Sequence, residues 1–145
     1  MRLMTAAALC AALIVSARAQ APSLSGAWTV TAEATEGTTD DGGTWKQNAV
    51  SGTLTLDHKG AEVAGSWKGV MANPWTLSGS FKDREFELRT EWRELPITRS
   101  GVQSMERVRW VFRGTVTGDT ADGTVSIETA KQEGRLQPFT AKRTP

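Results

Sequence analysis

Apolar and polar residues alternate along most of the chain after residue 20, and the alternation has a period of two. Because successive side chains of a β-strand point to opposite faces, this pattern predicts strands with one buried face. About eight such runs are separated by turn-forming residues, among them Lys82-Asp83 and Gly118-Asp119-Thr120. No stretch of useful length repeats with the helical period. The sequence therefore predicts an all-β domain.

Six of the predicted strands carry a glycine two residues before a bulky apolar side chain, on the same face. The pairs are Gly26/Trp28, Gly52/Leu54, Gly65/Trp67, Gly79/Phe81, Gly114/Val116 and Gly123/Val125. Glycine weakens a strand unless the backbone bends sharply or a neighbour needs the space. Its repetition favours a single antiparallel up-and-down barrel of about eight strands. A β-sandwich, whose corners use the same glycines, is the alternative.

Charged residues alternate with the predicted inward row of two neighbouring strands. If these strands pair around Ser100, Glu87 lies opposite Arg113 and Glu91 lies opposite Arg109. A row of paired charges is typical of a face in water, so this face is predicted to be the barrel exterior.

The first 19 residues have the three parts of an export signal: Arg2, an apolar stretch over residues 3–15, and a small-x-small ending at Ala19. We expect cleavage between Ala19 and Gln20, which leaves residues 20–145 as a single β-barrel domain that is periplasmic or secreted. The only cysteine, Cys10, lies in the leader, so the mature domain is predicted to have no disulfide.

Composition narrows the function of the mature chain. The whole chain has 17 Lys and Arg and 16 Asp and Glu. Removal of the leader removes two arginines, so the mature chain has 15 basic and 16 acidic residues and a net charge of −1. Near neutrality argues against a nucleic-acid partner, and no further apolar segment is long enough for a membrane span. The only histidine, His58, lies in a predicted turn without a catalytic partner. One histidine and no mature cysteine also leave no metal site. We expect no enzyme activity and no cofactor.

The two ends of the mature chain resemble the calycin group, the lipocalin-like small β-barrels. The residues that carry the resemblance are Gly26 and Trp28 near the start and Arg143 near the end. In lipocalins a Gly-x-Trp opens the first strand, and a basic residue late in the last strand lies over that indole at the closed end. The resemblance implies that Trp28 pairs with Arg143, and that Glu33–Gly43 lies over the open mouth. The chain departs from lipocalins in having no disulfide, no Tyr and no recognisable middle motif.

The six tryptophans suggest an interior ligand site. Trp67, Trp75, Trp92 and Trp110 are predicted to wall a pocket for a small apolar ligand, with Thr90 as the polar group that orients it. The alternative is that the indoles fill the core and that Thr90 bonds to backbone. The chain would then be a non-enzymatic accessory or interaction domain, as in barrels appended to exported amidohydrolases. Trp45 falls outside the inward row and is predicted at the mouth or on the surface.

Overall fold

The fold is known from a computed structural model that describes residues 21–69 and 73–145. The predicted leader and its cleavage site lie outside the described residues. Within these ranges no helix is long and apolar enough to cross a membrane. The strands are β1 (Gly26–Ala32), β2 (Thr35–Thr38), β3 (Thr44–Gln47), β4 (Val50–Lys59), β5 (Glu62–Lys68), β6 (Trp75–Lys82), β7 (Glu85–Thr90), β8 (Arg93–Arg99), β9 (Val102–Thr117), β10 (Thr120–Thr129) and β11 (Gln137–Arg143).

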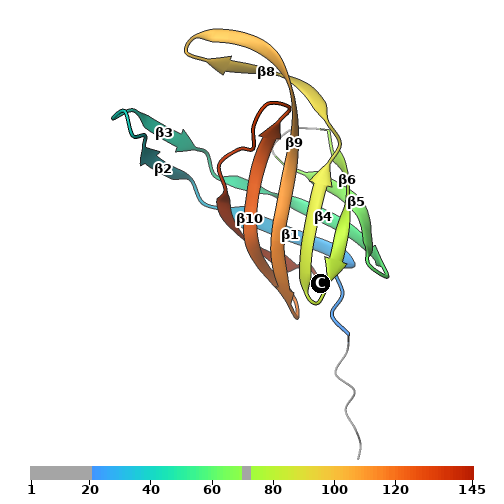
Figure 1. Cartoon of the computed structure of the whole chain (residues 1–145). Helices are drawn as coiled ribbons and strands as arrows, with labels where there is room; N and C mark the ends of the chain where they lie inside the picture. Colours follow the sequence, from blue (N-terminus) through green and yellow to red (C-terminus); the bar gives the residue numbers. More distant parts are fainter. Residues whose placement is uncertain (1–20, 70–72) are drawn as a thin grey trace, which may run out of the picture.

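Eight strands close into an antiparallel barrel, in the ring order β1-β4-β5-β6-β7-β9-β10-β11 (Figure 1). Apart from the insertions β2, β3 and β8, ring order follows chain order, which confirms the predicted up-and-down barrel over the sandwich. The first and last strands close the ring, with Trp28 opposite Arg143 and Val30 opposite Ala141. This is the register that the sequence predicts.

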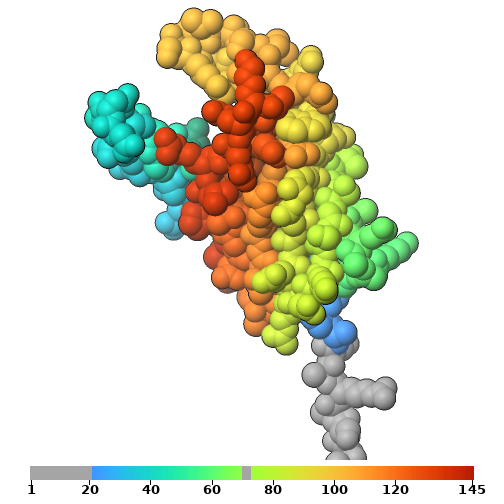
Figure 2. Space-filling view, in the orientation of Figure 1, coloured from blue at the N-terminus to red at the C-terminus, as the bar shows by residue number. Residues whose placement is uncertain are grey.

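Two hairpins extend beyond the barrel at the end opposite the C-terminus (Figure 1). One consists of β2 and β3, and the other of β8 and the first half of β9. Both stand clear of the barrel surface in Figure 2. The segment Glu33–Gly43, predicted to lie over the mouth, instead forms β2 and the turn that leads to β3, because the two short strands satisfy each other's backbone groups.

The inward alternation shifts by one residue between β7 and β8. Arg89 in β7 pairs with Val111 of β9, and Arg93 in β8 pairs with Val108 of β9. The segment from β7 to β8 therefore contains one residue more than the part of β9 that lies opposite it. Such an extra residue exchanges the two faces of a strand. Beyond it Leu95 packs against the core, whereas Trp92 does not belong to the core. The prediction that Trp92 faces the interior is corrected for this reason.

His58 is also placed differently from the prediction. It lies inside β4, and the turn that follows is closed by the pair Lys59 and Glu62. Its ring packs edge-on against Phe81, with ring centres 4.6 Å apart. His58 is therefore a packing residue near the closed end.

Core-facing glycines allow neighbouring strands to approach closely. A Cβ added at Gly79 would lie 1.9 Å from the carbonyl oxygen of Glu87 on β7, and one at Gly65 would lie 1.9 Å from that of Thr55 on β4. No side chain fits at such a distance, so glycine is required where the sheet coils most tightly.

Of the two charge pairs predicted on the outer face, the pair of Glu87 with Arg113 is present and the pair of Glu91 with Arg109 is not. Glu87 pairs with Arg113 in the ladder, and its carboxylate lies 2.9 Å from the Arg113 guanidinium. That hydrogen bond is the main reason that the pKa of Glu87 is lowered, and Arg89 adds to the effect. Glu91 does not pair with Arg109, because the extra residue interrupts the register. It binds Arg93 at 2.6 Å instead.

Candidate functional site: a pocket at the barrel mouth

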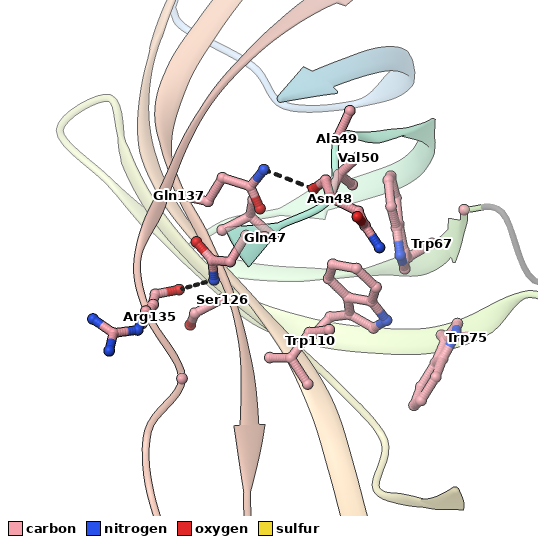
Figure 3. Close-up of a pocket in the computed structure, with 14 residues that line it drawn as sticks. Gln47, Asn48, Ala49, Val50, Trp67, Trp75, Trp110, Ser126, Arg135 and Gln137 are labelled. Atoms are coloured by element: carbon pink, nitrogen blue, oxygen red, sulfur yellow. Dashed lines mark hydrogen bonds between the residues drawn. The ribbon is translucent and has the colours of Figure 1, made fainter. Parts of the chain in front are cut away.

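The pocket forms at the mouth, where β11 is shorter than its neighbour β10. β1 ends at Ala32, opposite Val50 at the start of β4. β11 begins at Gln137, opposite Val125, whereas β10 continues to Thr129. The gap leaves a cavity of about 560 Å³, bordered by Val50 and the residues before it on one side and by Ser126 and its neighbours on the other (Figure 3). The two projecting hairpins rise from this same end (Figure 1).

Three indoles form the apolar wall of the pocket. They are Trp67 at the end of β5, Trp75 at the start of β6 and Trp110 in β9. Trp67 and Trp75 are opposite each other in the β5–β6 ladder, and both are buried. The ring of Trp110 lies 5.7 Å from that of Trp67, which also packs edge-on against Phe112 at 5.0 Å. Strand alternation places all three inward, as the sequence predicts.

Thr90 is buried near these indoles but does not line the pocket. Its hydroxyl oxygen accepts a hydrogen bond from the backbone N–H of Trp110 at 2.8 Å and donates to the carbonyl of Glu91 at 3.1 Å. The alternative prediction, a bond to backbone, therefore describes Thr90. Its effect on the pocket is to fix the strand that carries Trp110.

Trp92 lies outside the pocket as well. Its half-buried indole is covered by Arg109, whose guanidinium carbon is 4.3 Å from the ring centre. Arg109 belongs to the outer row and forms an ion pair with Glu128 at 2.7 Å. The extra residue after β7 thus moves this indole from the inner to the outer side.

Amide side chains form the polar side of the pocket, and the sequence prediction did not include them. Gln137 is buried, and its Nε2 donates to the carbonyls of Glu33 at 2.7 Å and Asn48 at 3.0 Å. Both of its amide hydrogens are used, and they tie the end of β1 to the start of β4. The signal for Gln137 was present, since it precedes Phe139 by two residues in the inward row of β11.

Gln47 and Asn48 come from the end of the β2–β3 hairpin, where no inward alternation marks them. Gln47 Nε2 donates to the carbonyl of Arg135 at 3.1 Å, and its Oε1 accepts from Thr35 at 3.0 Å. These bonds join the hairpin to the segment between β10 and β11. No local pattern of residues indicates this contact, because 88 positions separate its two residues.

The lining has little charge. Arg135 contributes its backbone, while its side chain points away from the pocket (Figure 3). Its guanidinium carbon lies 4.3 Å from the ring of Trp45, which places Trp45 on the surface beside the mouth. Within residues 21–69 and 73–145, no three His, Cys, Asp or Glu side chains gather as metal ligands would.

The opposite end of the barrel is packed shut. The guanidinium of Arg143 covers Trp28 and donates to the carbonyl of Ser23 at 2.7 Å and to Asp119 at 3.0 Å. The indole nitrogen of Trp28 donates to the carbonyl of Leu24 at 2.9 Å. Residues before β1 are thereby held across this end.

Fold and pocket together define a closed eight-stranded antiparallel β-barrel with one filled end and one indole-lined mouth. Comparison with family models, with curated proteins and with solved structures gives no match to the chain.

Proposed function

We propose that this protein is a lipocalin-like barrel that binds one small apolar ligand in the mouth pocket. The observation that carries the proposal is the cavity of about 560 Å³ walled by Trp67, Trp75 and Trp110. Sites for small molecules typically measure roughly 300–1,000 Å³ and combine apolar walls with a few polar groups. The closed-end arrangement of Gly26, Trp28 and Arg143 supports the lipocalin-like assignment.

The indoles set the scale of the affinity. Burying about 200 Å² of apolar ligand surface contributes roughly 5 kcal/mol, at about 25 cal/mol per Å². Stacking on an indole adds about 0.5–1.5 kcal/mol for each ring. The loss of translational and rotational freedom, roughly 4–15 kcal/mol, offsets much of this gain. At the lower end of that cost and the upper end of the stacking gain, stacking on one to three rings leaves a binding free energy of roughly 2.5–5.5 kcal/mol, so we expect a dissociation constant of about 0.1 mM or weaker for an aromatic ligand.

A titration with N-phenyl-1-naphthylamine tests the proposal, since this dye becomes fluorescent when it leaves water. The wild-type protein should bind it saturably with one site per chain. Trp110→Ala should weaken binding by about tenfold or more, because a wall of the pocket is removed.

Trp92→Ala is the matched control, since this indole is equally large but lies under Arg109 on the outer side. It should leave dye binding unchanged. The absence of saturable binding to the wild type would contradict the ligand-binding proposal.

Export is a further part of the proposal and is supported by the three-part leader of residues 1–19. The mature protein should be found outside the cytoplasm with Gln20 as its first residue. Amino-terminal sequencing of the purified protein checks this, and a retained Met1 in an exported fraction would count against cleavage.

The second candidate is a non-enzymatic accessory domain that acts through its surface. The observation in its favour is the β8–β9 hairpin, where Val102 and Met105 are 68% and 63% exposed. If this hairpin is the functional surface, the double variant Val102→Thr/Met105→Gln should impair the function of the protein in the cell. The same variant should still bind the dye. Loss of function through Trp110→Ala but not through the hairpin variant would argue for the pocket.

A further inference from the structure

The indole N–H of Trp67 is a buried donor without an acceptor. Trp67 is fully buried, and its Nε1 has no hydrogen-bond partner among residues 21–69 and 73–145. A buried donor left unpaired costs about 1–3 kcal/mol, so native proteins rarely keep one without a reason. By contrast, the indole N–H of Trp28, at the closed end, is paired with the carbonyl of Leu24.

This donor belongs to the pocket lining. In Figure 3 the nitrogen lies at the end of the Trp67 ring nearer to Trp110, among the side chains that border the cavity. Gly69, also in the lining, lies against this edge of the indole. A Cβ there would lie 3.3 Å from Nε1. Asn48 is also in the lining, and its side chain is exposed.

Ser126 also borders the cavity, but its side chain is on the outer face of β10, since it is opposite Val111 and follows the inward Val125. The hydroxyl of Ser126, in β10, is buried and has no hydrogen-bond partner. Gln137 has already used both of its amide hydrogens, so it cannot serve as an additional donor. The unpaired donor at the pocket is thus the Trp67 N–H, which is set among apolar rings.

We propose that the ligand is a flat aromatic molecule with a carbonyl-type acceptor, whose oxygen accepts a hydrogen bond from Trp67 Nε1. This inference rests on the proposed ligand-binding function and specifies the chemistry of the ligand. The indoles of Trp75 and Trp110 supply faces on which an aromatic ring stacks. A purely hydrocarbon ligand leaves the Trp67 donor unpaired and gains less.

A matched pair of ligands tests this inference. Fluorene and 9-fluorenone share one tricyclic frame. They differ at a single position, which is a CH₂ group in fluorene and a C=O group in 9-fluorenone. Their dissociation constants can be measured by equilibrium dialysis against the full mature protein, with the free ligand determined by absorbance. The ratio of the two constants is then compared between protein variants, so that the different water solubilities of the two compounds cancel.

Trp67→Phe removes the donor and keeps an aromatic wall. We expect the wild type to favour fluorenone over fluorene by about tenfold more than this variant does. Gly69→Ala keeps the donor but adds a methyl group beside it, and it should reduce the preference for fluorenone too. It also decides the question if Trp67→Phe does not fold, as judged by circular dichroism.

Asn48→Ala is the control, since it removes the neighbouring amide but leaves the indole. The preference for fluorenone should be retained or increased in this variant. Its loss in Asn48→Ala would overturn the inference by showing that the amide is the donor. An equal ratio in wild type and Trp67→Phe would overturn it as well. If neither compound binds to the wild type, the ligand-binding proposal itself fails, which is a distinct result.

Discussion

The guanidinium carbon of Arg143, near the end of the last strand, lies 4.4 Å from the ring centre of Trp28 in the first strand. The two residues are directly opposite in the β1–β11 ladder, so the contact closes the barrel in space as well as in register. A cation over an indole face contributes about 0.5–2 kcal/mol, depending on how dry the site is.

Trp28→Ala should therefore destabilise the protein by about 3–5 kcal/mol, because it empties a fully enclosed site and removes the surface on which Arg143 rests. Urea unfolding followed by circular dichroism measures the change. Trp92→Ala, at a half-buried indole, is the comparison and should cost clearly less. A loss at Trp28 no larger than the one at Trp92 would mean that the closed end contributes little to stability.

Gly79→Ala should destabilise the barrel by about 1–3 kcal/mol or prevent folding, since the new methyl group meets the Glu87 carbonyl oxygen at 1.9 Å. The strands must separate or the coil must relax to make room. The adjacent exposed Ser78→Ala is the matched control and should change stability by no more than about 0.5 kcal/mol. Thermal unfolding of the two variants separates steric crowding from a general sensitivity of β6.

Glu87 should make stability dependent on pH in the acid range. Because the Arg113 hydrogen bond lowers the pKa of Glu87 in the folded state, the unfolded chain binds more protons near the ordinary value of 4.5. The stabilisation that ionised Glu87 gives to the folded state is complete above that value. It is lost as the pH falls through the lowered folded-state pKa of Glu87. The carboxylate is partly exposed, so solvent screening keeps the effect small.

Glu87→Gln should accordingly flatten part of the decline in unfolding free energy below about pH 4.5. Urea unfolding at a series of pH values measures the slope. Glu62→Gln, at an exposed glutamate in β5, provides the control and should keep the wild-type slope. A Glu87→Gln curve parallel to the wild type across this range would contradict the assignment.

Gln137→Ala should affect both stability and the pocket. It removes the two hydrogen bonds that tie Glu33 to Asn48 and leaves their carbonyls unpaired, a loss of about 1–3 kcal/mol. The dye titration should show weaker binding as well, because the residues beside Asn48 lose their anchor. Gln132→Ala, an exposed glutamine in the β10–β11 connection, should change neither quantity by a comparable amount.

The barrel itself could be predicted because its evidence is local. Alternation within single strands indicates which side chains are buried, and it places Trp67, Trp75 and Trp110 inward without knowledge of any partner strand. The repeated glycines indicate tight coiling, since only close contact between strands explains them. The pairing of Trp28 with Arg143 was implied by the resemblance to lipocalins, and it agrees with the antiparallel pairing of the first and last strands that closes the ring.

The position of Trp92 could not be predicted in the same way. Its face depends on one extra residue between β7 and β8, and that residue is defined only by the partner strand β9. The polar side of the pocket presents the same difficulty. Gln47 and Arg135 meet through a contact that no short stretch of sequence records.

The sequence by itself thus determined the class of fold and the inward row of most barrel strands, because strand alternation is a property of neighbouring residues. Only the tertiary structure decided that β11 stops short of β10 and that a pocket lies between Val50 and Ser126. It alone also showed that the Trp67 N–H has no acceptor in the part of the chain that the structure describes. Both features depend on where separate strands end relative to one another, which alternation within a strand does not specify.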